Sequence, residues 1–324
     1  MADEDNPATA FLVARDGPST AALRGAIVAI GNFDGVHRGH RRVIDAAVAR
    51  ARQSGQRALA LTFEPHTRAY FRPQEKLFRL TDEPAKLRLL ASTGLDGAIV
   101  LAFDAALAAL SAEEFVQRTL VERLAVRGAA VGFDFHFGQA RQGSPDFLVG
   151  EGRKHGFAVD VAPRLTDGGR PVSSSAIRAA LAAGDVSEAA ALLGYPWFVS
   201  GTVAHGDKRG RDLGFPTANL QLDPACGLRH GIFAVRAAVG GKRYGGVASF
   251  GRRPTFDNGA PLFETFLFDF DGDLYGQAID VALIAWVRPE LRFDSAEELV
   301  RRMQQDAREA RDALALAPDA FPPI

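Results

Sequence analysis

The chain has 324 residues, of which 47% are hydrophobic, so it is long enough for one large or two ordinary globular domains. Its 38 basic residues balance 39 acidic ones, for a formal net charge of -1. Proteins that bind nucleic acid or anionic membranes usually carry a basic surplus, so neither partner is expected. A few local cations would still suffice to bind a phosphorylated small molecule.

The cysteine content and the first residues indicate a cytoplasmic protein. Cys226 is the only cysteine, which rules out an intramolecular disulfide and suits a reducing compartment. The chain begins Met-Ala-Asp-Glu-Asp, which is acidic where a signal peptide needs positive charge. No uninterrupted apolar run approaches the roughly 18 residues of a membrane-spanning helix. We therefore expect a cytoplasmic protein that binds neither membranes nor nucleic acid.

The first part of the chain alternates short apolar runs with helical stretches. Five runs have the character of buried parallel strands: residues 26–30, 58–62, 97–101, 129–131 and 157–161. A helix is expected from His40 to about Gln53, and Ser111 with Glu114 forms a capping box that begins another. Strict alternation of strand and helix predicts a parallel sheet covered on both faces.

The pattern changes around residues 194–196, where a second domain is expected to begin. Short β runs follow, with hairpin turns predicted at Gly240-Gly241 and Asp271-Gly272. Ser295 then caps a final helix. Strands followed by one helix predict a small antiparallel β-barrel with a helix packed on it. We place the two domains at residues 20–184 and 187–316.

A glycine-rich segment, residues 31–40, comes directly after the first strand and carries the first candidate site. It brings His37 and His40 to the start of a helix, where backbone N–H groups and the helix dipole favour an anion. Two imidazoles three residues apart can donate to phosphate oxygens. The segment is neither a Walker A loop nor a dinucleotide-binding GxGxxG motif. The alternative is a plain glycine-rich turn with two exposed histidines.

This segment resembles the GxFDGxHxGH signature of the nucleotidyltransferase superfamily, in the form found in bacterial bifunctional riboflavin kinase/FAD synthetases. Three further segments follow in the family's order: residues 62–66, 132–138 and 173–178. The resemblance implies a Rossmann-like domain in which His37 and His40 are catalytic and hold ATP phosphates. It extends the ATP and phosphate site to Gly31, Asn32, Phe33, Asp34, Ser174 and Arg178.

Two departures from that family pattern are visible, and one of them removes a charge. Ser175 replaces the usual threonine and keeps its hydroxyl, whereas His136 stands where arginine is common, so we assign His136 no role. The alternative for residues 173–178 is a plain serine N-cap of the next helix, and both interpretations can hold together.

A second candidate site lies in residues 201–219, where glycines alternate with basic residues. Thr217 and Asn219 are two residues apart, so an extended chain places their hydroxyl and amide on one side. Both supply the oxygen ligands that Mg²⁺ accepts alongside nucleotide phosphates. Taken alone, the segment could equally be a basic surface hairpin.

Residues 214–219 resemble the GFPTAN signature of riboflavin kinases, and the segments after them also follow the order of that family. The resemblance implies that Thr217 and Asn219 hold Mg-ATP and that Glu264 is the general base for the riboflavin 5′-hydroxyl. The expected ATP and flavin site of the kinase comprises Gly206, Lys208, Gly210, Arg211, Gly214, Pro216, Thr217 and Asn219. Ser249 and Phe266 stand where asparagine and histidine are frequent, so we assign them no role.

Period-two alternation places Glu264 on the same face of its strand as three aromatic residues, Phe266, Phe268 and Phe270. A carboxylate on such a face is costly unless it is paired or functional. If it faces a pocket, burial would raise its pKa toward that of a useful general base. The alternative is a glutamate near the end of the strand that simply reaches solvent.

The resemblance predicts a two-activity transferase. ATP and riboflavin would give FMN and ADP in the barrel, and ATP and FMN would give FAD and diphosphate in the α/β domain. Its partners are then riboflavin, FMN and ATP, and its cofactor is Mg²⁺. No protein partner is assigned apart from weak self-association. Three alternatives remain: one activity is vestigial, the protein is a flavin-binding regulator or store, or the acceptor is pantetheine phosphate or nicotinate nucleotide.

Overall fold

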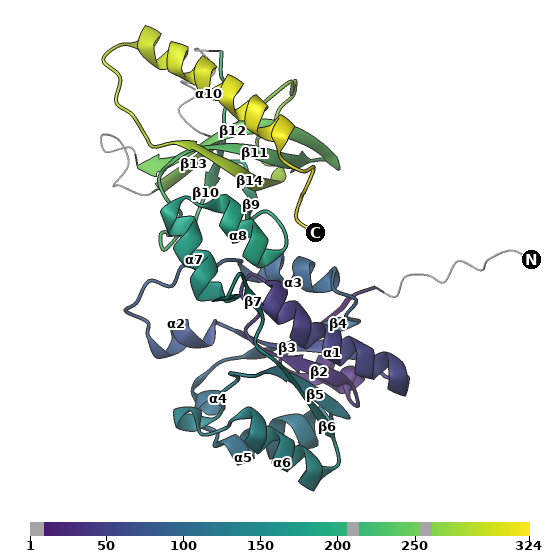
Figure 1. Cartoon of the computed structure of the whole chain (residues 1–324). Coiled ribbons are helices and arrows are strands. Elements are labelled where there is room, and N and C mark those ends of the chain that lie inside the picture. The colour runs from purple at the N-terminus through teal and green to yellow at the C-terminus, as the bar shows by residue number, and fades with distance from the viewer. Residues whose placement is uncertain (1–9, 206–213, 253–260) are drawn as a thin grey trace, which may run out of the picture. The chain divides into compact units, whose positions relative to one another are not determined.

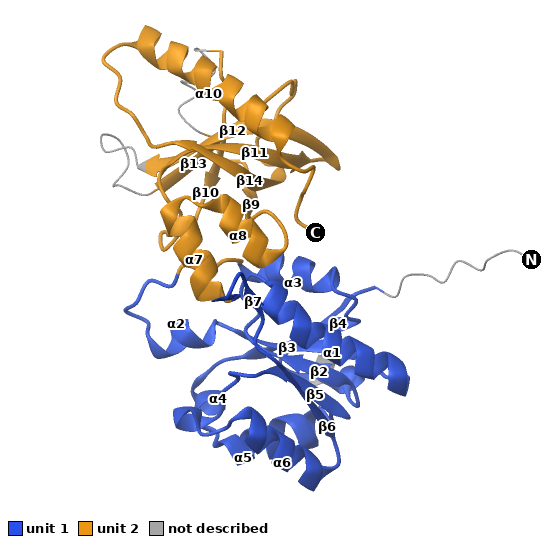
Figure 2. Ribbon diagram, in the orientation of Figure 1, with its two compact units in different colours: residues 1–77, 82–172, 324 blue, residues 78–81, 173–323 orange. Residues whose placement is uncertain are grey.

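The computed structural model of the chain describes residues 10–205, 214–252 and 261–324 (Figure 1). These residues form two compact units, which Figure 2 shows in separate colours. The first unit comprises residues 1–77, 82–172 and 324, and the second comprises residues 78–81 and 173–323.

The first unit is built on a six-stranded, fully parallel sheet with the order β1-β4-β3-β2-β5-β6. The strands are β1 (Leu12–Arg15), β2 (Ile27–Ile30), β3 (Ala58–Glu64), β4 (Gly97–Ala102), β5 (Gly128–Gly132) and β6 (Ala158–Ala162). From β2 the chain adds β3 and β4 on one side and β5 and β6 on the other. Open α/β sheets bind ligands at such a reversal of strand order, beyond the carboxyl ends of the strands, which here points to the end of β2.

Helices cover both faces of this sheet (Figure 1). Helix α1 packs against β2, β3 and β5, α3 packs against β4, and α6 packs against β5 and β6. The helices of this unit are η1 (Pro18–Leu23), α1 (Arg38–Ser54), α2 (Thr67–Phe71), α3 (Glu83–Ala91), α4 (Ala105–Ala109), α5 (Ala112–Glu114), η2 (Phe115–Arg123), η3 (Gln139–Arg141) and α6 (Pro145–His155). A small hairpin, β7 (Thr166–Asp167) and β8 (Arg170–Pro171), follows β6.

The expected strands and helices of this unit are confirmed within a few residues. All residues of β2 are buried, as are all but the last of β3, because a sheet covered on both faces needs apolar side chains in both directions. The Ser111–Glu114 capping box is present, although the helix continues in π form through η2. Edge strand β1 was not predicted, because it has only four residues and most of them are not buried.

The second unit contains a nearly closed antiparallel barrel with the strand order β10-β13-β12-β11-β14-β9. An isolated bridge between Ala204 and Asn219 joins the two edges of the sheet. The strands are β9 (Phe198–Thr202), β10 (Ala218–Gln221), β11 (Gly231–Val239), β12 (Lys242–Arg252), β13 (Pro261–Leu267) and β14 (Ala278–Arg288). Both halves of the predicted fold class, the parallel α/β domain and the barrel, are thereby confirmed.

Helix α10 (Ala296–Leu316) begins at the predicted cap Ser295 and packs against β11, β12 and β14. The predicted turn at Gly240-Gly241 is confirmed, because both residues have positive φ (54° and 79°) between paired strands β11 and β12. The prediction of a tight turn at Asp271-Gly272 is wrong. Strand β13 ends at Leu267, and residues 268–277 lead to β14, which does not pair with β13.

Helices α7 (Ser174–Ala183) and α8 (Val186–Leu193) belong to the second unit, together with the short segment 78–81. Arg178 Nε donates to the Phe78 carbonyl oxygen (2.5 Å), and Trp197 Nε1 donates to the Leu80 carbonyl oxygen (2.8 Å). The Phe78 and Trp197 rings also meet edge to face at 5.7 Å. Compactness does not show which fragment folds alone, so the domain bounds 20–184 and 187–316 stay predictions.

Candidate active sites

The loop between β2 and α1 has an unusual backbone that fixes the first site. Phe33, Gly35 and Val36 have φ values of 51°, 81° and 35°. Left-handed backbone costs a non-glycine residue about 1–3 kcal/mol and persists only where the surroundings enforce it. Phe33 and Val36 are almost completely buried, so packing of their side chains supplies that enforcement. The loop therefore presents the start of α1 in one defined conformation.

His37 is the N-cap of α1, and its ring is positioned by the helix that it caps. Its Nδ1 accepts a hydrogen bond from the His40 backbone N–H (3.2 Å), which leaves the ring proton on Nε2. The His37 and His40 rings stack with centroids 3.6 Å apart. Gly39 makes this possible, because a Cβ there would come within 3.0 Å of His37 Cε1.

Burial lowers the pKa of His40 well below its usual value, and neighbouring His37, His66 and Lys86 lower it further. The residue keeps some exposed surface, but its Nδ1 is buried and has no hydrogen-bond partner among the described residues. His40 is therefore neutral near pH 7, and a neutral imidazole donates one hydrogen bond rather than two. The predicted phosphate contacts of the two histidines then require one N–H from each ring.

The other predicted residues of this segment support the histidine pair. Phe33 meets the His40 ring edge to face at 5.4 Å, and Asp34 is almost fully buried. Asn32 Nδ2 donates to Thr67 Oγ1 (3.0 Å), which ties the loop to the first turn of α2. Gly31 donates its N–H to the Leu61 carbonyl oxygen (3.1 Å) and so continues the pairing of β2 with β3.

Ser174 and Arg178, predicted to bind the same triphosphate, lie on α7. The neighbouring Ser173 caps this helix by accepting from the Ala176 N–H (3.2 Å), so the expectation of a plain N-cap is confirmed for that serine. Helix α7 belongs to the second compact unit, whereas His37 and His40 belong to the first. Joint action of the four side chains on one nucleotide stays a prediction.

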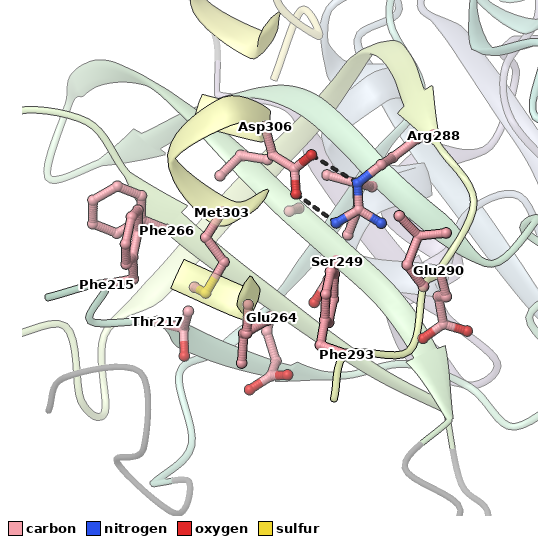
Figure 3. Close-up of a pocket in the computed structure, with 15 residues that line it drawn as sticks. Phe215, Thr217, Ser249, Glu264, Phe266, Arg288, Glu290, Phe293, Met303 and Asp306 are labelled. Atoms are coloured by element: carbon pink, nitrogen blue, oxygen red, sulfur yellow. Dashed lines mark hydrogen bonds and ion pairs between the residues drawn. The ribbon is translucent and has the colours of Figure 1, made fainter. Parts of the chain in front are cut away.

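The second unit holds a cavity of about 330 Å³ between the barrel and α10 (Figure 3). Strands β11, β12 and β13 supply one wall, and α10 and the residues after β14 supply the other. It is lined by Phe215, Thr217, Ile232, Val247, Ala248, Ser249, Glu264, Phe266, Arg288, Glu290, Leu291, Phe293, Leu299, Met303 and Asp306. The lining is mainly aromatic and aliphatic with a few polar groups, which is typical of small-molecule sites.

The predicted kinase residues Thr217 and Glu264 both line this cavity. Asn219 on β10 stands directly opposite Glu264 on β13, so the two side chains share one face of the sheet. Asn219 is buried, and its Oδ1 has no hydrogen-bond partner among the described residues. A buried amide oxygen with no partner in the described part of the chain, on the same face of the sheet as the Glu264 carboxylate, fits a bound divalent cation.

The predicted alternation along β13 is confirmed where the strand is regular. Glu264 and Phe266 line the cavity, whereas the alternate residues Phe263, Thr265 and Leu267 are buried on the opposite face. The predicted alternation does not extend to Phe268 and Phe270, because the strand ends at Leu267.

An ion-pair cluster at the cavity was missed by the sequence analysis. Arg288 at the end of β14 donates to both carboxylate oxygens of Asp306 on α10, Nε to Oδ1 at 2.7 Å and Nη2 to Oδ2 at 2.5 Å. Arg302 adds a third bond to Asp306 Oδ1 (2.9 Å). Figure 3 shows the Arg288–Asp306 pair within the cavity lining. The pair attaches α10 to the barrel at this point.

Comparison with known proteins assigns each unit to a family. The FAD synthetase family model matches residues 19–176, and the riboflavin kinase family model matches residues 193–314. A bifunctional riboflavin kinase/FMN adenylyltransferase from Escherichia coli K12 is 39% identical over 93% of this chain and 97% of its own. One of the same name from Pseudomonas fluorescens is 42% identical over 92% and 95%. This chain belongs to the bifunctional riboflavin kinase/FMN adenylyltransferase family. The predicted family resemblance is thereby confirmed.

A solved structure supports the same architecture for this family member. It is titled a macrolide-efflux protein from Streptococcus pneumoniae, and it matches with a TM-score of 0.80 and 30% identity over 89% of this chain and 94% of its own. Within residues 10–205, 214–252 and 261–324, no helix is long and apolar enough to cross a membrane.

The remaining predicted residues of the kinase site and its surroundings differ in where they lie. Gly206, Lys208, Gly210 and Arg211 lie outside the described residues. Gly214 has a φ of 84°, and neither it nor Pro216 lines the cavity. Ser249 and Phe266, which were given no role, both line it. His136, also without an assigned role, places its Nδ1 2.9 Å from the Asp134 carbonyl oxygen.

Proposed function

We propose that this chain is a transferase that converts riboflavin and ATP to FMN and ADP, and then FMN and a second ATP to FAD and diphosphate. The observation that carries the proposal is the match of one chain to two family models, FAD synthetase on residues 19–176 and riboflavin kinase on residues 193–314. The histidine loop (residues 31–40) lies in the first matched segment, and the cavity lined by Glu264 lies in the second. The loop offers imidazole donors for phosphate oxygens, and the cavity offers a carboxylate that can accept a proton.

In the kinase step, riboflavin would occupy the cavity between the barrel and α10. Glu264 would accept the proton of the 5′-hydroxyl as its oxygen attacks the γ-phosphorus of ATP, with ADP as leaving group. The location of Glu264 among the cavity residues, partly shielded from solvent, supports this role. Thr217 and Asn219 would hold Mg²⁺, which supplies neutralisation of polyphosphate charge when bound. The buried Oδ1 of Asn219, which has no hydrogen-bond partner within residues 10–205, 214–252 and 261–324, supports that assignment.

In the adenylyl step, a phosphate oxygen of FMN would attack the α-phosphorus of ATP, and diphosphate would leave. The His37 Nε2–H and the ring of neutral His40 would donate to oxygens on which negative charge develops, beside the positive end of the α1 dipole. Gly31, Asn32, Phe33 and Asp34 would form the nucleotide cradle, and Ser174 and Arg178 would contact the leaving diphosphate. No covalent intermediate is needed, since alignment and charge stabilisation carry the step.

We place the enzyme in the cytoplasm, where its substrates riboflavin, FMN and ATP would meet it. The single cysteine, Cys226, supports that placement only through its compatibility with a reducing compartment.

One experiment tests both activities. Pure protein is incubated with Mg-ATP and either riboflavin or FMN, and the flavins are separated by chromatography. We expect FMN and FAD from riboflavin, and FAD from FMN. Formation of FMN alone from riboflavin would leave only a kinase, FAD from added FMN without riboflavin turnover would leave only an adenylyltransferase, and neither product would favour a flavin-binding protein.

A further inference from the structure

Lys86 is a buried cation close to the histidine loop that no motif of the sequence singles out. It lies on α3 with only 1% of its surface exposed. Its ammonium contacts Glu64 Oε1 at 2.7 Å and Thr62 Oγ1 at 3.3 Å. Lysine is seldom fully buried unless it is paired, because transfer of its charge from water is costly. This pair lies at the carboxyl end of β3, beside the strand that leads into the histidine loop.

The hydrogen-bond directions connect Lys86 to that loop. A lysine ammonium can only donate, so Thr62 Oγ1 is the acceptor in its contact with Lys86. The Thr62 hydroxyl proton is then available for the Asn32 carbonyl oxygen, which lies 3.3 Å away. The Asn32 side chain is held separately by Thr67. The first residue after Gly31 is thus fixed by a chain of contacts that starts at Lys86.

Lys86 also acts on His40 through its charge. The groups that face His40 are the rings of His37 and Phe33 and the side chains of His66 and Lys86, with Glu64 paired to Lys86. After burial and the two imidazoles, the positive charge of Lys86 further lowers the pKa of His40. Removal of that charge would favour protonation of His40.

We propose that Lys86 is a positioning residue for adenylyl transfer, which fixes Asn32 through Thr62 in the loop that carries His37 and His40. This inference rests on the proposed adenylyltransferase function of the first unit. The described hydrogen bonds of Lys86 go to Glu64 and Thr62, so it acts on the position of Asn32 through Thr62. The competing interpretation is that Lys86–Glu64 is a buried pair that stabilises the fold and nothing else.

The test uses the full-length chain with Lys86→Met, Lys86→Arg and Thr62→Val. Lys154→Met is the matched control, because this lysine is also paired with a glutamate of the same unit (Glu113, 3.1 Å) but is half exposed. FAD formation from FMN and Mg-ATP is measured for kcat, for KM and across pH. Thermal unfolding followed by circular dichroism reports whether each variant is folded, and riboflavin phosphorylation by the same preparations checks that the effect is confined to adenylyl transfer.

We expect Lys86→Met and Thr62→Val to lower kcat for FAD formation by about 10- to 100-fold, the scale expected for misplaced catalytic groups, with smaller changes in KM. Lys86→Arg should retain more activity than Lys86→Met, and Lys154→Met should match wild type. Only Lys86→Met should also move the acid limb of the pH profile to higher pH, because Thr62→Val leaves the charge in place.

Two results would overturn the inference while leaving the adenylyl activity established. One is a folded Lys86→Met variant with wild-type kcat and pH profile. The other is a Lys86→Met variant that fails to fold, together with a Thr62→Val variant whose kcat equals that of wild type. A wild-type protein that makes no FAD from FMN would instead refute the proposed function, and the inference with it.

Discussion

Asp306→Asn should destabilise the second unit strongly and weaken riboflavin binding. Asp306 is 5% exposed in its side chain and receives three hydrogen bonds, two from Arg288 and one from Arg302. The substitution keeps the shape of the side chain but leaves the guanidinium of Arg288, itself only 11% exposed, without its counter-charge. Loss of one partner of such a buried pair costs about 3–5 kcal/mol.

Tryptophan fluorescence during urea unfolding measures the loss of unfolding free energy in the second unit. The chain has two tryptophans, Trp197 and Trp286, and both belong to the second unit. With a urea m value of about 2 kcal/mol/M, the midpoint should fall by roughly 1.5–2.5 M. Because Arg288 and Asp306 also line the cavity, the KM for riboflavin should rise in conditions where the variant is folded.

Glu309→Gln is the matched control for the same helix. Glu309 pairs with Arg302 at 3.1 Å, but its side chain is 35% exposed. Exposed pairs contribute about 0–1 kcal/mol, so the urea midpoint should hardly move. Equal midpoints for Asp306→Asn and Glu309→Gln would show that the buried cluster does not hold α10 to the barrel.

Four other predictions concern the two reactions. Glu264→Gln should slow riboflavin phosphorylation by about 10² or more, the usual scale for loss of a general base, and leave FMN adenylylation unchanged; a near wild-type rate of phosphorylation would refute the general-base role. Replacement of His37 and His40 by alanine should abolish FAD formation, since each donor is worth about 10²–10³ in rate, while FMN formation continues; a parallel loss of kinase activity would refute their assignment to one step. Burial, with its neighbours, lowers the pKa of His40 below its ordinary value of 6.5, so the unfolded chain binds this proton first. The contribution of His40 to stability is therefore fully present above pH 6.5 and is lost as the pH falls below it. Thermal unfolding of wild type and His40→Gln at pH 7 and pH 5.5 measures this contribution. If the melting temperature falls by the same amount in the two proteins between these pH values, the prediction is wrong. Both reactions should stop on exhaustive chelation with EDTA and resume with Mg²⁺, because each handles an ATP polyphosphate; full turnover in EDTA would exclude the cation.

Local sequence patterns predicted most of the fold, because they record constraints that act between near neighbours. The apolar runs of β2 and β3 reflect burial on both faces, and the caps at Ser111 and Ser295 satisfy backbone groups within the same turn. The assignment of segment 78–81 to the second unit was beyond such reasoning. It depends on hydrogen bonds from Arg178 and Trp197 across about a hundred residues of chain, for which no local pattern exists.

The site residues that the sequence revealed belong to local motifs, whereas those that it did not reveal depend on contacts between distant parts of the chain. The motif residues Thr217 and Glu264 do line one cavity, but Arg288, Asp306 and Lys86 were not assigned to any site. Each belongs to a cation–carboxylate pair whose members lie on different elements, and surface arginines and lysines are too common for such a pair to be recognised before the fold is known. Burial distinguishes these pairs: Lys86, Asp306 and Arg288 have side chains 2%, 5% and 11% exposed, whereas pairs such as Arg68–Glu75 are about half exposed. Because the desolvation of a charge must be offset by its partners, a buried pair constrains the two elements that it joins far more than an exposed one. Among the ion pairs of the described residues, Lys86–Glu64 and Arg288–Asp306 are the most buried. The first joins α3 to the end of β3 next to the histidine loop, and the second joins α10 to the barrel at the cavity that Glu264 lines.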